Sequence, residues 1–243
     1  MSVVVIPARY ESSRLPGKPL AKIGGVPMIL RTAERCMKSG ADRVIVVTDD
    51  IRVLDVCGTV DGLECSMSDP AIPSGTDRVA KVAKFIEDDI VINVQGDEPF
   101  IDPELIDALI AELRADAGLN MVTACTPFED GEDSDNPNAV KVVFGADGNA
   151  LYFSRLPIPY DRDGSGTQRY RHIGIYGFRK DFLLKFSSME PGRLENTEKL
   201  EQLRAMEAGE KIRVLVTGYK PVSVDTAEDL IKAEEYLKRL GNG

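Results

Sequence analysis

The sequence predicts an α/β fold in which a doubly wound, mostly parallel sheet carries a small antiparallel arm. Three runs rich in β-branched residues, at 2–6, 43–48 and 90–94, have the composition of buried strands. Helical patterns separate them, and this alternation is typical of parallel strands joined by right-handed crossovers. Between residues 127 and 192 the alternation weakens. We therefore expect one domain over residues 1–243, with an antiparallel insertion at roughly 127–192.

The first half of the chain contains most of the predicted parallel strands. After the first strand, a turn at Gly24-Gly25 precedes a helix at 28–39, with Pro27 at its first position and Gly40 just beyond its end. The other elements expected here are a strand at 43–48, a less clear helix and strand ending near 67, a helix at 76–87 and a strand at 90–94.

The second half departs from simple alternation. A helix is expected from 102 to about 117, followed by a strand at 121–126. Residues 139–144 and 150–154 flank Asp147-Gly148, a dipeptide that favours a hairpin turn. The remaining expected elements are a strand at 170–178, a helix at 193–208, a strand at 212–217 and a final helix at 227–240.

A cationic loop follows the first strand. Arg9, Arg14 and Lys18 lie in a stretch where Pro16 and Gly17 disfavour a helix. Ligands of open α/β sheets bind at the carboxyl ends of the strands, and these side chains suit a polyphosphate there. From composition alone, a solvated basic surface loop is an equally good interpretation. The loop lacks the glycine spacing and the Lys-Ser/Thr ending of a Walker P-loop.

Composition limits the class of partner. The net charge is −10, which argues against general binding to nucleic acid or to an anionic membrane surface. The four cysteines form no CxxC pair and His172 is the sole histidine, so a zinc site of ordinary spacing is not expected. With no run that resembles a signal peptide or a membrane span, we expect a cytoplasmic protein with reduced thiols.

Several polar residues stand where helices begin or strands end. Ser74 and Gly75 open a helix, where they either cap it or approach a ligand. Asp97 follows the strand at 90–94, as a Mg²⁺ ligand or as a turn residue. Asp225 precedes the last helix, where a capping aspartate is common, and a lone histidine such as His172 is by default structural. The residues alone leave these alternatives open.

One long motif resembles a known family. IPARYESSRLPGKPL, from Ile6 to Leu20, resembles the signature of the 3-deoxy-manno-octulosonate (Kdo) cytidylyltransferases, whose sheet is of the nucleotide-diphospho-sugar transferase type. The likeness continues through SGTDR, VQGDEP, DNPNAVKVV, ALYFSR and VDTAEDL, and therefore covers nearly the whole chain. Two of these motifs, DNPNAVKVV and ALYFSR, resemble the segment that forms dimers and covers the acceptor in that family.

The resemblance implies that CTP and Kdo are converted to CMP-Kdo and pyrophosphate, with Mg²⁺ as cofactor, for lipopolysaccharide biosynthesis. It assigns catalytic roles to Arg14, Lys18 and Asp97, and it assigns the metal to Asp97 and Asp225. The nucleotide-binding residues that it implies are Ala8, Arg9, Arg14, Lys18, Ser74, Gly75, Arg78 and Gln95, with Arg78 toward the phosphates. The sugar-acid residues that it implies are Gln95, His172, Tyr176, Glu201 and Gln202.

Two alternatives remain at this point. The acceptor is either Kdo or another 2-keto sugar acid, such as a sialate or an 8-amino-Kdo analogue. The second alternative is a regulator that binds CTP without catalysis, although such a protein has little need for both Asp97 and Asp225. The expected partners are CTP, Kdo and a second copy of the chain, with no nucleic acid and no membrane.

Overall fold

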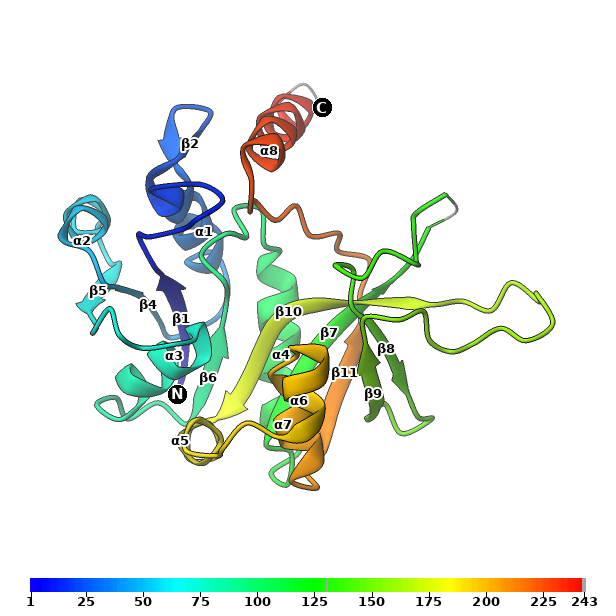
Figure 1. Cartoon of the computed structure of the whole chain (residues 1–243). Helices are drawn as coiled ribbons and strands as arrows, with labels where there is room; N and C mark the ends of the chain where they lie inside the picture. Colours follow the sequence, from blue (N-terminus) through cyan, green and yellow to red (C-terminus); the bar gives the residue numbers. More distant parts are fainter. Residues whose placement is uncertain (130, 242–243) are drawn as a thin grey trace.

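The computed structural model describes residues 1–129 and 131–241. Residue 130, in the predicted arm, and residues 242–243, in the predicted domain span, lie outside the described residues. Within the described ranges, nine strands form one sheet, and seven of them follow the order β11-β7-β10-β6-β1-β4-β5 (Figure 1). These seven are β1 (Ser2–Ala8), β4 (Arg43–Thr48), β5 (Glu64–Met67), β6 (Ile90–Asn93), β7 (Met121–Pro127), β10 (Tyr170–Arg179) and β11 (Ile212–Val216).

The pairing confirms a mostly parallel sheet. β1 is parallel to both β4 and β6, β4 is parallel to β5, and β11 is parallel to β7. β10 lies antiparallel between β6 and β7. Because β1, β4 and β6 run in the same direction, the loops that follow them meet at one edge of the sheet, where ligands of this fold class bind.

The predicted hairpin is confirmed. β8 (Lys141–Phe144) pairs antiparallel with β9 (Ala150–Ser154), and β8 also pairs with β10. Gly148 in the connecting turn has φ 75°, a conformation that side chains disfavour. Figure 1 shows the hairpin at one side of the sheet and the chain between β9 and β10 extending away from it.

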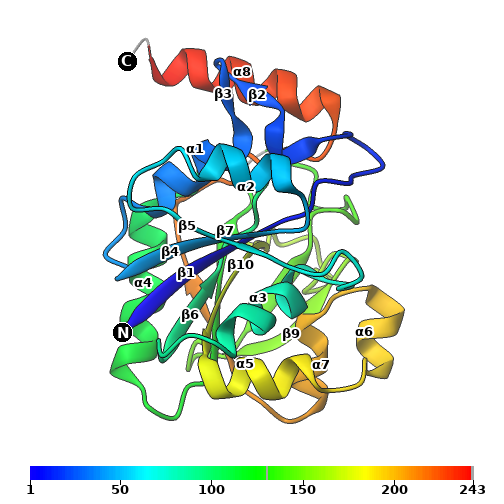
Figure 2. The same ribbon diagram turned by 90° about the vertical axis from the view of Figure 1, so that its left-hand side faces the viewer.

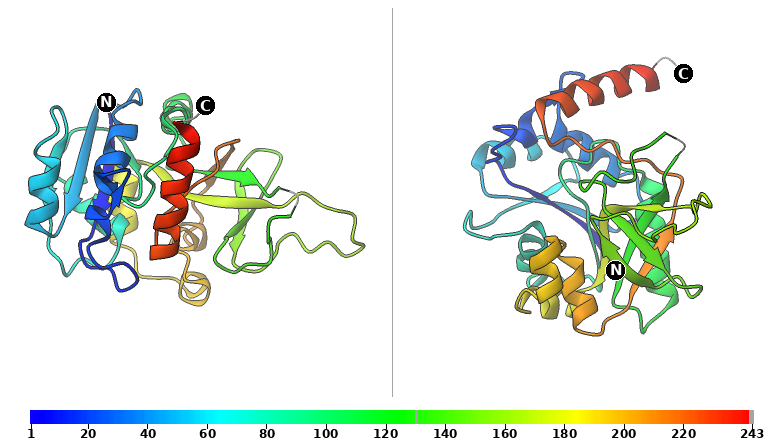
Figure 3. Two further views of the ribbon diagram at one scale, coloured as in Figure 1. Left: turned by 90° about the horizontal axis from the view of Figure 1, so that it is seen from above. Right: turned by 45° about the vertical axis from the view of Figure 1, so that its right-hand side comes forward.

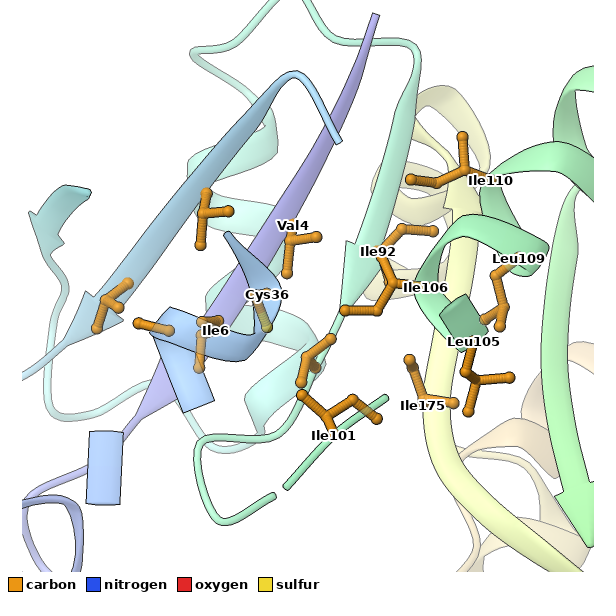
Figure 4. Close-up of a cluster of buried hydrophobic side chains, with 14 of the residues drawn as sticks. Val4, Ile6, Cys36, Ile92, Ile101, Leu105, Ile106, Leu109, Ile110 and Ile175 are labelled. Atoms are coloured by element: carbon orange, nitrogen blue, oxygen red, sulfur yellow. The ribbon is translucent and has the colours of Figure 1, made fainter. Parts of the chain in front are cut away.

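Helices cover both faces of the sheet (Figure 2). α1 (Met28–Cys36), α2 (Ile51–Cys57) and α4 (Pro103–Ala115) pack on the face that includes Val4 and Ile6 (Figure 4). α3 (Gly75–Ala83) and α5 (Lys180–Ser187) pack on the opposite face, against Val3 and Val5. Successive residues of β1 therefore enter two different cores, as the alternation of side chains along a strand requires.

The prediction of a single helix at 193–208 is wrong. The segment forms two helices, α6 (Arg193–Glu198) and α7 (Gln202–Glu207), and Lys199 between them has a left-handed φ of 53°. The Arg204 guanidinium donates two hydrogen bonds of 2.7 Å to the Glu195 carboxylate across the break. This partly buried ion pair and the burial of Leu200 outweigh the local preference for a continuous helix.

Three smaller boundaries also differ from prediction. α1 ends at Cys36, where the Ser39 hydroxyl donates to the Cys36 carbonyl at 2.6 Å and begins a turn. Pro27 precedes the first helical residue of α1 and lies outside the helix. α3 ends at Ala83 and is therefore shorter than expected.

The C-terminal helix returns to the start of the chain. α8 (Ala227–Leu240) packs on the small hairpin of β2 (Lys22–Ile23) and β3 (Val26–Pro27), and Figure 3 shows the helix from above. The Gly24 amide donates to Glu234 at 2.7 Å, and Ile23 and Ala233 share a small apolar cluster. This contact holds the segment before α8 beside the loop that leaves β1. Within residues 1–129 and 131–241, no helix is both long and apolar enough to cross a membrane.

Candidate active site

Two cations and two carboxylates from three segments meet beyond the carboxyl ends of β1 and β6. The Lys18 Nζ lies 2.5 Å from Asp97 Oδ2 and 3.0 Å from Asp225 Oδ1. Arg14 Nη2 lies 3.1 Å from the same oxygen of Asp225. Burial by itself lowers the pKa of the Lys18 ammonium, but the two carboxylates outweigh burial and raise this pKa above its usual value. One ammonium therefore joins two carboxylates that are distant in sequence.

The segment before α8 is tied directly to the loop after β6. The Val224 amide donates to the Asp97 carbonyl at 3.0 Å. Glu98 accepts hydrogen bonds from the hydroxyls of Ser223 and Tyr219, the latter at 3.4 Å. Burial raises the pKa of Glu98 to about 7, and the adjacent Asp97 carboxylate acts in the same direction. These contacts set the separation between the carboxylates of Asp97 and Asp225. Glu98 was not singled out from the sequence.

Asp225 is not the cap of α8, so that alternative is wrong. Thr226 is the N-cap, and its side chain accepts from the Asp229 amide at 3.2 Å. The Asp229 carboxylate accepts in return from the Thr226 amide, which completes a capping box. The Asp225 side chain is therefore free to face Lys18 and Arg14.

A cavity of about 150 Å³ adjoins this cluster. Its walls come from the loop after β1, the start of α3 and the loop after β6. Six predicted residues are among those that line it, namely Ala8, Arg9, Lys18, Gly75, Gln95 and Asp97. The structure thus brings together most of the residues expected around a nucleotide.

A second cavity of about 260 Å³ is also lined by Asp97. Asp225, Arg171 and His172 also line it. Asp97 is thus the residue shared by the two cavities. Its carboxylate would therefore adjoin a ligand in either cavity. Arg171 was not singled out from the sequence, although it directly precedes the predicted His172.

Comparison with known proteins decides the family. The cytidylyltransferase family profile matches residues 3–212. A 3-deoxy-manno-octulosonate cytidylyltransferase from Syntrophotalea carbinolica is 48% identical, over 97% of this chain and 98% of that protein. The protein of the same name from Xanthomonas oryzae pv. oryzae is 47% identical, over 96% of this chain and 94% of that protein. The chain belongs to the 3-deoxy-manno-octulosonate cytidylyltransferase family.

Solved structures agree with this family. A CMP:2-keto-3-deoxy-manno-octonic acid synthetase complexed with CTP has a TM-score of 0.93 and 41% identity, and the match covers 98% of each chain. A putative glucose-1-phosphate thymidylyltransferase from Bacillus anthracis is only 14% identical, with a TM-score of 0.71, and shows the shared fold alone. The predicted family and the predicted nucleotidyltransferase type of sheet are both confirmed.

In this member of the family, the start of α3 is joined to α7. Ser74 caps α3, accepting from the Asp77 amide at 3.0 Å, and its hydroxyl also lies 3.0 Å from Glu201 Oε1. Thr76 donates to Glu201 Oε2 at 2.6 Å. Burial raises the pKa of Glu201, although these two hydroxyls and the Arg204 guanidinium oppose the shift. Capping and a role in the site are therefore compatible for Ser74.

Arg78 is fully buried. Its guanidinium contacts the Ser68 hydroxyl and lies 3.3 Å from Asp49 Oδ2, and burial lowers its pKa. Asp49 also approaches Arg9 at 3.8 Å and accepts from the Tyr10 amide at 2.9 Å. Asp49 was not predicted, but its place directly after β4, at the same sheet edge, was a usable signal. A role for Arg78 toward the phosphates stays a prediction.

The predicted sugar-acid residues are distributed over three places in the family fold. His172 lines the larger cavity, Gln95 lines the smaller one, and Tyr176 lies beside His172 with a ring separation of 5.5 Å. Glu201 and Gln202 lie at the start of α7 and line neither cavity. Gln202 is buried, and its Nε2 has no hydrogen-bond partner among the described residues.

The His172 ring is hydrogen-bonded to a buried hydroxyl. Thr123 Oγ1 lies 2.9 Å from His172 Nε2, and the carbonyls of Ile175 and Ile173 lie 2.7 Å and 3.3 Å from the same hydroxyl. Burial lowers the pKa of His172 to about 3.

Proposed function

We propose that the chain transfers a cytidylyl group from CTP to Kdo, giving CMP-Kdo and pyrophosphate for lipopolysaccharide biosynthesis. The observation that carries this proposal is the position of Asp97, whose carboxylate adjoins both cavities and also contacts Lys18. A transferase of this kind must bring an anionic nucleotide and an anionic sugar acid together at one point. The full-length similarity to proteins named for this reaction supports the same choice of substrates.

The chemistry requires positioning and neutralisation of charge. The anomeric 2-hydroxyl of Kdo attacks the α-phosphorus of CTP, and the bond to the pyrophosphate oxygen breaks. Such transfers need little covalent assistance from the protein. We assign Arg14 and Lys18 to the β- and γ-phosphates, where they stabilise the leaving group. Lys18 must then exchange its two carboxylate partners for phosphate oxygens when the nucleotide binds.

Asp97 and Asp225 are suited to hold Mg²⁺. The Lys18 ammonium already places one positive charge within 3.0 Å of both carboxylates, so the side chains converge on a site for a cation. Mg²⁺ favours hard oxygen ligands and usually binds through one or two carboxylates plus substrate phosphates. When bound, it would neutralise charge at the α-phosphate and lower the pKa of the attacking hydroxyl.

We assign the cytosine and ribose to the smaller cavity and the sugar acid to the larger one. Arg171 in the larger cavity offers a cation for the sugar carboxylate, and His172 lines the same cavity. Tyr176, beside His172, is a proposed part of this pocket. Glu201 and Gln202 line neither cavity, and their role toward the sugar acid stays a prediction. Gln202 has a buried amide Nε2 without a protein partner, which favours a role toward a ligand.

We further propose that the enzyme is a cytoplasmic homodimer. Three large apolar side chains of the arm are exposed, Leu151 by 65%, Leu156 by 70% and Tyr160 by 83%. Exposed apolar groups in one segment favour a contact with another protein surface. The four free cysteines are typical of a reducing compartment.

A pyrophosphate-release assay with CTP and Kdo tests the reaction, with CMP-Kdo identified by mass. Parallel reactions with a sialate and with 8-amino-Kdo separate the acceptors, and we expect Kdo to give the largest kcat/KM. CTP binding with no release of pyrophosphate from CTP in the presence of any of the three acceptors would favour the regulator and contradict the proposed activity.

A further inference from the structure

Four side chains form a hydrogen-bonded series from α7 to the loop after β6. Glu201 Oε2 accepts from the Thr76 hydroxyl at 2.6 Å. Thr76 Oγ1 lies 3.2 Å from Asn93 Nδ2, and Asn93 Oδ1 lies 3.0 Å from Gln95 Nε2. The series therefore connects the start of α7, through α3 and the end of β6, to the wall of the smaller cavity.

The Glu201 carboxylate, at one end of the series, sets the direction of every hydrogen bond in it. An ionised carboxylate only accepts, so Thr76 gives its single proton to Glu201 and must accept from Asn93. The Asn93 amide group is then turned so that its carbonyl oxygen faces Gln95. Gln95 must donate to that oxygen through Nε2, which leaves its own carbonyl oxygen for another partner. Burial raises the pKa of Glu201, whereas the Thr76 and Ser74 hydroxyls and the Arg204 guanidinium, 3.8 Å away, favour its ionised carboxylate.

Only the last member of the series reaches a cavity. Thr76 is 4% exposed and Asn93 is 0% exposed, and neither lines the smaller cavity. Gln95 does line it, together with Gly75. The Gln95 Oε1 would lie 3.2 Å from a Cβ placed on Gly75, so this oxygen is on the side of the cavity formed by the start of α3.

We propose that Thr76 and Asn93 are positioning residues that hold Gln95 as a hydrogen-bond acceptor, so that the site selects a ligand group that donates. The proposal rests on the proposed function, in which two groups could supply this donor. One is the exocyclic amino group of cytosine, and the other is a hydroxyl of the sugar acid. If the base is the source, UTP is rejected because uracil presents an oxygen at that position to another oxygen.

The test compares Thr76→Val, which removes the hydroxyl but keeps the branched shape, with Thr76→Ser, which keeps the hydroxyl. Amide NMR of the nucleotide-free proteins reports the series directly, with the Gln95 resonance assigned by its loss in Gln95→Glu. In wild type and in Thr76→Ser, we expect one amide proton each of Asn93 and Gln95 to exchange slowly with water. In Thr76→Val, the Asn93 amide loses its acceptor and both protons exchange faster.

Fast exchange of both protons in the wild type would overturn the proposal. This measurement needs no turnover, so its result is separate from the success of the proposed function. Apart from Gln95→Glu for the assignment, it needs only wild type and Thr76→Ser, so it still applies if Thr76→Val does not fold.

The kinetic part of the test measures kcat/KM for CTP and UTP, and KM for Kdo. If cytosine is the donor, Thr76→Val lowers the preference for CTP over UTP by about tenfold to a hundredfold, whereas Thr76→Ser keeps it. If a sugar hydroxyl is the donor, Thr76→Val raises KM for Kdo by a similar factor and leaves the nucleotide preference unchanged. Either result supports the series, and Thr76→Val indistinguishable from Thr76→Ser in both quantities would overturn it.

Discussion

The Lys18 ammonium lies 2.5 Å from the Asp97 carboxylate and joins the loop after β1 to the loop after β6. The same ammonium also contacts Asp225, which is 207 residues away in sequence. Without a cation, these two carboxylates would repel each other at the edge of the sheet. Lys18 thus serves as the internal cation of the nucleotide-free protein, and we propose that it moves to phosphate oxygens when nucleotide and Mg²⁺ bind.

Replacing Lys18 should make the protein depend on Mg²⁺ for stability. Lys18→Met keeps the length of the side chain but removes its charge, so Asp97 and Asp225 repel each other. We expect the free energy of unfolding to fall by about 1–2 kcal/mol without nucleotide, and turnover to fall by about tenfold to a hundredfold. Thermal denaturation over a Mg²⁺ series is the measurement, with Lys22→Met, an exposed lysine of β2, as control. Equal stabilisation of both variants by Mg²⁺ would contradict this role of Lys18.

A side chain at Gly75 should obstruct the smaller cavity. In Gly75→Ala, the new Cβ would lie 3.2 Å from Gln95 Oε1 and 3.3 Å from Pro7 Cγ, so Gln95 must shift. We expect KM for CTP to rise by about tenfold, while the melting temperature stays the same or increases because alanine favours the helix. Gly218→Ala is the control, since nothing lies within 4 Å of its Cβ position. An unchanged KM in Gly75→Ala would place the nucleotide elsewhere.

His172 should make the fold sensitive to mild acid. Burial lowers its pKa to about 3 in the folded state, whereas an unfolded histidine titrates near 6.5. Below pH 6.5 the unfolded chain binds a proton that the folded chain does not, so stability is complete above this pH and decreases as the pH falls toward 3. The loss at pH 5 is at most about 2 kcal/mol. Chemical denaturation at pH 7 and pH 5 should show a smaller loss in His172→Gln than in wild type. Equal losses of stability in the two proteins would show that His172 is not the source of the acid sensitivity.

The arm should control assembly. Leu156→Glu places a charge on an apolar side chain that is 70% exposed, and we expect the variant to sediment as a monomer while the wild type sediments as a dimer. Phe85→Glu is the matched control, because Phe85 is 88% exposed but lies outside the arm. A dimer in Leu156→Glu and a monomer in Phe85→Glu would move the interface to the other end of the sheet.

Sequence patterns predicted the elements whose local signals agree with their surroundings. The β-branched run of β1 and the hairpin around Gly148 are found as predicted. The loop after β1 departs from the prediction, because Lys18–Leu20 forms one turn of 3-10 helix that begins after Gly17. The break at Lys199 was missed because it depends on an ion pair between Arg204 and Glu195, a tertiary contact that no helical period reveals.

The site was predictable mainly through motifs. Residue spacing alone left Asp225 undecided between a cap and a ligand, and the structure excludes the cap because Thr226 occupies that position. Asp49 and Glu98 were missed, although each follows a strand at the same edge. Their importance depends on partners that fold back from elsewhere, such as the buried Arg78 and the hydroxyl of Ser223.

The Mg²⁺ dependence of pyrophosphate release in Asp225→Asn tests the central claim most directly. Asparagine keeps the size of the side chain but removes the charge that Mg²⁺ favours. If Asp97 and Asp225 share the metal, the variant needs far more Mg²⁺ than wild type and turns over slowly, with little change in melting temperature. Asp229→Asn, which alters the nearby capping box, should keep the wild-type Mg²⁺ requirement. An unchanged Mg²⁺ requirement in Asp225→Asn would contradict a metal site shared with Asp97.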